Sequence, residues 1–203
     1  MTITGDDTEK IKRLNGSLFH EFEMKDLGNL KYFLGIKMLR SEGGIFLRQK
    51  KYVLDILVET GLIDCKPVDT SILVNHGLQI SDEAELADQG KYQCLVGKLI
   101  YLSHTRLDIA YAVGTVSQFM HRPQKDHYVA ALRIVRYLKG TAEHGIMFKK
   151  NEHRGIYGFT DADWASNLVD RKSIARYFTF VEGNLVTWRS KKQKVVAISS
   201  VEV

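Results

Sequence analysis

Cysteine is scarce in this sequence, and neither a long apolar run nor a cluster of histidines is present. The 203 residues contain two cysteines, Cys65 and Cys94, with no second pair to complete a zinc knuckle or a disulfide framework. No apolar run approaches the ~20 residues that cross a membrane, and no basic-then-apolar segment opens the chain as in a secretory signal. The seven histidines lack the spacing of metal ligands. These absences favour an intracellular protein with reduced thiols, without distinguishing cytoplasm from nucleus.

Familiar catalytic motifs are also missing, and the charge is uneven. No serine has the surroundings of a hydrolase nucleophile, and Gly43-Gly44 predicts a turn rather than a phosphate-binding loop. The composition, 44% hydrophobic and 26% charged, is that of an ordinary globular protein. Residues 1–90 contain 11 Lys/Arg and 15 Asp/Glu, net −4, whereas residues 91–203 contain 18 and 9, net +9. A basic half is typical of a phosphate-binding surface, although the same lysines could simply solvate helix faces.

Hydrophobic periodicity predicts an α+β chain. Apolar residues at helical spacing predict helices at 8–22, about 50–60, 91–103, 108–121 and 126–139, the second ending at Gly61 and the last capped by Asp126. Alternation from Leu30 to Leu47, interrupted by SEGG (41–44), predicts a β-hairpin. Strands are predicted at 146–148, 156–160, 177–181 and 185–188, with a tight turn at 182–184 and a short apolar run at 195–198. Residues 64–90 contain Pro67 and an acidic, poorly periodic run, which predicts a linker.

Two carboxylates, Asp161 and Asp163, follow the predicted strand that ends at Thr160. Because side chains alternate along a strand, the two point the same way if the strand persists. Paired carboxylates suit Mg²⁺, a hard cation that takes oxygen ligands and accepts phosphate oxygens in its remaining positions. Asp161 and Asp163 are therefore candidate metal ligands. The alternative is a polar turn in which Asp163 caps local backbone donors.

A dense basic run, Arg189-Ser190-Lys191-Lys192-Gln193-Lys194, follows Trp188. Its cations, Arg189, Lys191, Lys192 and Lys194, are candidate contacts to a nucleic-acid backbone. The alternative is a solvated loop between a strand and a helix. The predicted helix at 126–139 extends the positive surface with three further cations, Arg133, Arg136 and Lys139. Arg133 and Arg136 are three residues apart and therefore share a helical face.

The last residues form a helix-start signal. Ser199-Ser200-Val201-Glu202 is a Ser-x-x-Glu capping box, in which the serine and the glutamate satisfy backbone donors at a helix N-terminus. Only Val203 follows it. We therefore expect this chain to be a piece of a longer polypeptide.

Seven strings, in this order, resemble the Pol polyprotein of copia-type LTR retrotransposons, especially those of plants. Each string is moderately specific alone, and together they cover nearly the whole chain. They are MKDLGNLKYFLGIKM (24–38), GIFLRQKKYVLDIL (44–57), YQCLVGKLIYLSHTRLDIAYAV (92–113), SQFMHRP (117–123), RIVRYLKGT (133–141), FTDADWAS (159–166) and NLVTWRSKKQKVVAISS (184–200).

The resemblance implies a map of the chain. Phe33, Leu34 and Gly35 would belong to the primer-grip hairpin of a reverse transcriptase, Asp161 would match the first catalytic aspartate of an RNase H domain, and Glu202 an acid on its first helix. In that family two Mg²⁺ ions activate water and stabilise the leaving oxygen during cleavage of the RNA strand. The implied partner is an RNA–DNA hybrid or duplex nucleic acid. The implied domains are the palm end with the primer grip, a linker, a helical thumb/connection and the first part of an RNase H-like sheet, at 1–63, 64–90, 91–143 and 144–203.

Departures from the family pattern bear on activity. The paired polymerase aspartates would precede this chain, and the later RNase H acids would follow it. Leu107, Ile174 and Arg176 stand where the family favours Pro, a small polar residue and Gly. We therefore expect neither activity and no functionally bound Mg²⁺. Two alternatives remain: a non-catalytic nucleic-acid-binding remnant, and an unstable product whose exposed sheet edges favour aggregation.

Overall fold

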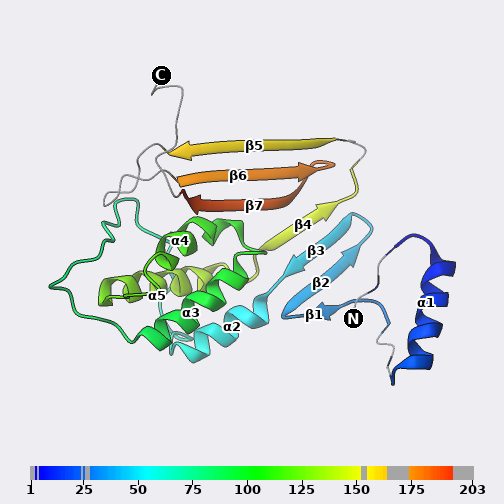
Figure 1. Cartoon of the computed structure of the whole chain (residues 1–203), viewed down its shortest axis with the longest axis horizontal. Coiled ribbons are helices and arrows are strands. Elements are labelled where there is room, and N and C mark those ends of the chain that lie inside the picture. The colour runs from blue at the N-terminus through cyan, green and yellow to red at the C-terminus, as the bar shows by residue number, and fades with distance from the viewer. Residues whose placement is uncertain are drawn as a thin grey trace.

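The computed structural model of the chain describes residues 3, 5–23, 25, 28–151, 155–163 and 174–193, without the side chains of Asp163 and Lys191. Figure 1 shows a group of helices flanked by two sheets, with one helix standing apart near the N-terminus. This separate helix, α1 (Thr8–Glu21), begins at Asp7, whose carboxylate accepts from the backbone N–H of Lys10, and it has no buried residue. The α+β prediction and the helix predicted at 8–22 are confirmed. No helix in the described residues is both long and apolar enough to cross a bilayer.

The first sheet has the strand order β1-β2-β3-β4, with all neighbours antiparallel. β2 (Ile36–Ser41) and β3 (Gly44–Arg48) form the hairpin predicted around SEGG. The alternation that starts at Leu30 contains a further turn that it did not predict, because β1 (Tyr32–Phe33) turns back into β2. Leu34 and Gly35 have φ of 49° and 79°. Positive φ at both central residues is the geometry of a two-residue hairpin turn that matches the twist of the strands.

The fourth strand of this sheet, β4 (Gly145–Lys149), comes from far along the chain. It pairs with β3, and Phe46 lies opposite Met147. The two backbones approach so closely that a Cβ on Gly145 would lie 2.1 Å from the carbonyl oxygen of Leu47. The segment predicted to begin the C-terminal domain therefore completes the N-terminal sheet.

The helical group contains the main core. It consists of α2 (Lys50–Glu59), α3 (Gln89–Leu102), α4 (Leu107–Ser117) and α5 (Lys125–Gly140), which match the four predicted helices closely. Gly61 follows α2 with φ 68°, as predicted for a residue after a helix end. Asp126 is not the cap of α5: Gln124 and His127 form a reciprocal capping box instead. The residues with no more than 1% exposure at the centre include Val53, Ile56, Leu57, Tyr92, Val96, Leu99, Leu102, Ile109, Ala112, Val116, Ala131, Ile134, Val135 and Leu138.

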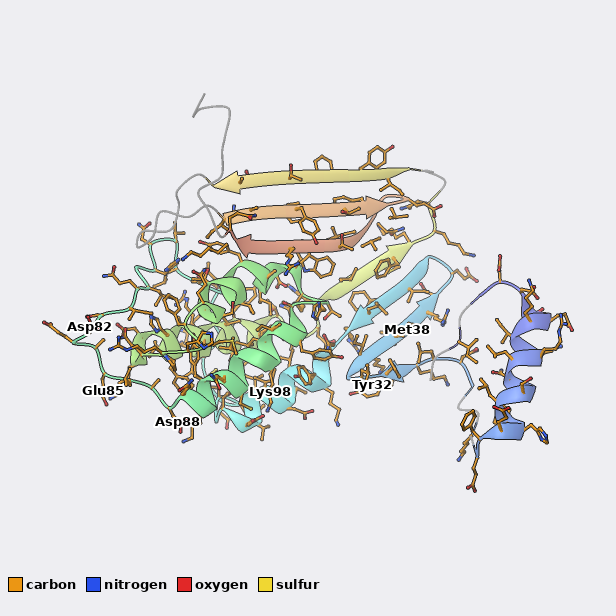
Figure 2. All side chains as sticks on the ribbon, viewed as in Figure 1. Tyr32, Met38, Asp82, Glu85, Asp88 and Lys98 are labelled. Carbon is orange, nitrogen blue, oxygen red and sulfur yellow. The ribbon has the colours of Figure 1, made fainter. Side chains whose placement is uncertain are left out.

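The segment predicted to be a linker, 64–90, has no helix or strand before α3 begins at Gln89, and it is fastened along the helical group. Just before this segment, the carbonyl of Ile63 accepts from Lys139 Nζ at 2.6 Å. Further along, Asp82 pairs with Arg122 at 2.9 Å, and Glu85 pairs with Lys125. Figure 2 shows Asp82 and Glu85 on the loop beyond the outer ends of the helices. The acidic run is therefore matched by cations near the start of α5.

The second sheet has the order β5-β6-β7 and is antiparallel throughout. Its strands are β5 (Ile156–Asp163), β6 (Ile174–Val181) and β7 (Asn184–Lys192), each longer than predicted. Glu182 and Gly183, with φ of 50° and 72°, make the predicted tight turn. β7 packs on α4, and Trp188 Nε1 donates to the carbonyl of Ser103 at 3.0 Å. The predicted apolar run at 195–198 lies outside the described residues.

Candidate nucleic-acid interface

The candidate catalytic carboxylate, Asp161, lies near the end of β5 directly opposite Arg176 of β6. Arg176 Nη1 donates to Asp161 Oδ2 at 3.2 Å. The arginine side chain is 26% exposed and the aspartate side chain 62%. The guanidinium carbon of Arg176 also lies 5.0 Å from the centre of the Tyr111 ring on α4. The β5–β6 register and the stacking on Tyr111 therefore hold the Arg176 guanidinium next to the Asp161 carboxylate.

Within the described part of the chain, this arrangement does not provide the ligands of a Mg²⁺ site. A site for that ion needs several oxygen ligands, whereas among the described residues no group of three or more His, Cys, Asp or Glu side chains could hold a metal. The only described carboxylate of the predicted pair has a guanidinium beside it. Glu202 and the side chain of Asp163 lie outside the described residues. The alternative of a polar turn at Asp163 is wrong, because this residue pairs with Ile174 within the sheet.

The basic run after Trp188 is a strand as far as Lys192, so the alternative of a loop is wrong for that stretch. Arg189 and Lys192 line a cavity of 770 Å³ between β7 and the helices α3 and α4. Ser103 and His104, at the end of α3, line the same cavity. Lys194 and the side chain of Lys191 lie outside the described residues. Two predicted cations thus open onto a hollow surface between a sheet and helices.

The three predicted contacts on α5 all have partners within the chain. Arg133 Nη2 donates to Thr70 Oγ1 at 2.8 Å, and Arg136 Nε donates to the carbonyl of Lys66 at 3.1 Å. Lys139 Nζ donates a hydrogen bond to the carbonyl of Ile63, as described above. These side chains hold the segment after α2 against α5. A role for them in nucleic-acid contact stays a prediction.

The predicted primer-grip residues lie at the β1–β2 turn and are accessible. Phe33 is 43% exposed and Leu34 is 67% exposed. The hydroxyl of Tyr101 on α3 donates to the carbonyl of Leu34. The Tyr101 ring also packs edge-on against Tyr52 of α2, with 5.3 Å between the ring centres. The turn is therefore attached to the helical group.

Four cations beside this turn were missed by the sequence reasoning. Lys37, Arg48, Lys50 and Lys51 line a cavity of 180 Å³ together with Tyr32 and Gly35. Figure 2 labels Tyr32 at this end of the first sheet. The signal was present in the sequence as RQKK (48–51), a basic run at a strand-to-helix junction.

Comparison with known proteins gives the family. The model of the family described as reverse transcriptase (RNA-dependent DNA polymerase) matches residues 1–74. The Pol polyproteins of transposons RE2 and RE1 of Arabidopsis thaliana are 40% and 41% identical to this chain over 98% of its length. The chain spans 14% of the length of each of these two polyproteins. An uncharacterized mitochondrial protein of the same plant is 38% identical over 98% of this chain and 83% of its own length. No solved structure matches. The chain belongs to the family of copia-type retrotransposon Pol polyproteins and includes a reverse-transcriptase segment.

Proposed function

We propose that this chain binds RNA–DNA hybrid or duplex nucleic acid without catalysing a reaction on it. One observation carries the proposal: the end of α3 joins both predicted contact surfaces. The hydroxyl of Tyr101 donates a hydrogen bond to the carbonyl of Leu34 in the β1–β2 turn. The carbonyl of Ser103 accepts a hydrogen bond from Trp188 of β7. Ser103 also lines the same cavity as Arg189 and Lys192. The β1–β2 turn and the basic strand β7 are therefore both attached to the C-terminal end of α3. Such a combination suits a backbone-contacting surface, because phosphate contacts dominate nucleic-acid affinity.

The domain assignment is part of the same proposal. We assign residues 1–63 to the end of the palm with the primer grip, 91–143 to the thumb/connection, and the residues from β5 onward, rather than from 144, to the start of an RNase H-like domain. The pairing of β4 with β3 argues that residues 145–149 belong structurally with the first sheet. The RNase H-like part then begins with β5, and β5–β7 supply three antiparallel strands.

The surroundings of Asp161 support the proposed lack of catalysis. Metal-dependent hydrolysis would need Asp161 free to bind a cation, together with further carboxylates. Arg176 instead donates a hydrogen bond to Asp161, at a position where the family resemblance leads us to expect Gly. The charge of the carboxylate is therefore balanced within the sheet.

A binding experiment tests the first part of the proposal. Fluorescence anisotropy with a labelled RNA–DNA hybrid should show an affinity that falls linearly with salt on logarithmic axes, with a slope of about −0.9 for each neutralised phosphate. Changing Arg189 and Lys192 to Gln should weaken binding and make the slope shallower. Lys91→Gln is the matched control, because its side chain is 76% exposed at the opposite end of α3. Equal affinities for the two variants would overturn the proposed surface.

A cleavage experiment tests the second part. The protein with Mg²⁺ and a hybrid carrying a labelled RNA strand should leave the strand intact, and Asp161→Asn should behave identically. Cleavage by the unaltered protein that disappears in Asp161→Asn would contradict the proposal. Arg176→Gly removes the internal counter-ion and serves as a second comparison.

A second candidate outcome is an unstable product without function. It is favoured by β5, where Ile156 is 75% exposed and Phe159 is 59% exposed. Exposed apolar side chains on an outer strand promote pairing with other chains. A cooperative urea transition of a monomeric protein would exclude this candidate. Unfolding without cooperativity would support it.

A further inference from the structure

A small basic cavity lies at the base of the β1–β2 turn, apart from the cavity beside β7. Its cationic walls are Lys37 from β2, Arg48 from β3, and Lys50 and Lys51 from the start of α2. Tyr32, Lys37 and Arg48 stand in register across three neighbouring strands. Among the described residues, no carboxylate lines this cavity.

The grouping of these cations opposes stability, and among the described residues only Arg48 and Lys50 have a compensating ion pair, with Glu143. Lys37 lies directly opposite Arg48 on the neighbouring strand, and like charges in that position are destabilising. Lys50 and Lys51 open α2, where the positive end of the helix dipole favours acidic residues. That first turn contains no acidic residue, and the side chain of its cap, Gln49, makes no capping bond. Local choices that conflict with stability are expected at functional sites.

Two buried donors at this junction have no acceptor in the described structure: Arg48 Nε and Gln49 Nε2. Gln49 is 2% exposed, and its Nε2 lies 3.8 Å from the position that a Cβ on Gly35 would take. Gly35 itself lines the cavity. A buried donor without an acceptor is costly. Of the two residues, Arg48 lines the cavity, so an anion there would supply an acceptor to its guanidinium.

Ion pairs within the described structure neutralise only two of the four cations that line this cavity. Glu143 pairs with both Arg48 and Lys50, and these contacts hold the pKa of Glu143 below its ordinary value, with the hydrogen bond from Lys50 as the main cause. Lys37 and Lys51 are exposed and have no ion-pair partner among the described residues. Two cations therefore remain to be neutralised at the cavity.

We propose that this cavity binds a phosphate group. Amino groups, a guanidinium and the uncapped first turn of a helix together form a phosphate-binding environment. The volume of 180 Å³ equals that of about six water molecules at ~30 Å³ each, which leaves room for one such group. If the group is a backbone phosphodiester, this site deepens the proposed function and rests on it. It would then fix one strand beside the β1–β2 turn.

The test uses the full chain and a double variant, Lys37→Ala with Lys51→Ala. These side chains have no described ion pairs, so we expect the variant to fold, and circular dichroism checks this. The matched control is Lys12→Ala with Lys91→Ala, which removes two equally charged side chains that are 77% and 76% exposed away from the cavity.

Inorganic phosphate is the first probe. In NMR titrations it should shift the amide resonances of Gly35, Lys50 and Lys51 in the unaltered protein and in the control, and the double variant should bind at least tenfold more weakly. Absence of these shifts in the unaltered protein, or equal shifts in the double variant, would overturn the site. This arm does not depend on whether the chain binds nucleic acid.

Duplex nucleic acid is the second probe. Loss of one backbone contact should make the salt slope of the double variant shallower by about 0.9 relative to the control. Equal slopes, together with phosphate shifts, would overturn the backbone source and assign the site to free phosphate. Failure of the unaltered protein to bind duplex would overturn the proposed function and the assignment of the site to a backbone phosphate. The titration with inorganic phosphate would still test whether the cavity binds phosphate.

Discussion

Replacing Arg106 with Leu should destabilise the protein more than any change to its surface ion pairs. The Arg106 side chain is 3% exposed. Its Nε and Nη2 donate to the two carboxylate oxygens of Asp108 at 2.9 and 2.6 Å. Nη1 and Nη2 donate to the carbonyl and hydroxyl of Thr141 at 2.9 and 2.6 Å. The network therefore ties the start of α4 to the end of α5.

The size of the effect follows from these contacts. Removing one partner of a buried ion pair costs about 3–5 kcal/mol. We expect a loss near the lower end, about 3 kcal/mol, because the Asp108 side chain is 32% exposed and keeps a hydrogen bond from Tyr137. At about 2–4 °C per kcal/mol for a chain of this size, Tm should fall by about 6–12 °C. Urea unfolding and calorimetry measure both quantities.

The matched control is Arg122→Leu. Arg122 forms the same type of pair with Asp82, but the two side chains are 50% and 90% exposed, so the expected loss is under about 1 kcal/mol. Acid should weaken the Asp108 network as well. Burial alone would raise the pKa of Asp108, but the hydrogen bond and charge of Arg106 hold it below its ordinary value. Its contribution is therefore complete above pH ~4 and is lost as the pH falls further. Equal losses for Arg106→Leu and Arg122→Leu would refute this reasoning.

Three further predictions concern other parts of the chain. Burial lowers the pKa of His127, so stability measured by urea should decrease as the pH falls below about 6.5, with a smaller decrease in His127→Asn. Gly145→Ala should cost about 3 kcal/mol in the same assay, since its Cβ would meet the carbonyl of Leu47 across the β3–β4 pair. Tyr101→Phe removes the bond to Leu34, so it should cost about 1 kcal/mol and lower hybrid affinity severalfold in anisotropy titrations.

Each of these predictions has a clear contrary result. A stability that is constant between pH 7 and pH 5 would contradict the account of His127. Tolerance of Gly145→Ala, at the same level as Gly16→Ala in the open helix α1, would show that the two strands separate without penalty. Unchanged hybrid affinity in Tyr101→Phe would show that attachment of the turn to α3 is irrelevant to binding.

The elements that the sequence predicted best are those with local signals. Helices α2 and α5 follow from apolar spacing, and the turn at Glu182-Gly183 follows from residues that tolerate positive φ. The turn at Leu34-Gly35 did not follow from periodicity, because leucine rarely adopts positive φ and the alternating pattern continues through the turn. The capping of α5 by Gln124 and His127 was missed because Asp126 is the stronger conventional signal.

The features of the site that could not be predicted depend on contacts between distant residues. The pairing of Arg176 with Asp161 requires the register of β5 on β6, which the sequence alone does not supply. The basic cavity requires Lys37 to stand opposite Arg48, and it requires the turn to lie over the start of α2. The basic runs were visible as charge, but their grouping into two cavities depends on the fold.

The central claim is that this chain binds nucleic acid through backbone contacts. Its most direct test is the affinity of the unaltered protein for an RNA–DNA hybrid, measured by anisotropy across a range of salt concentrations. We predict measurable binding whose logarithm falls linearly with the logarithm of salt concentration, at a slope of several times −0.9. No measurable binding at low salt, or an affinity that does not change with salt, would contradict the claim.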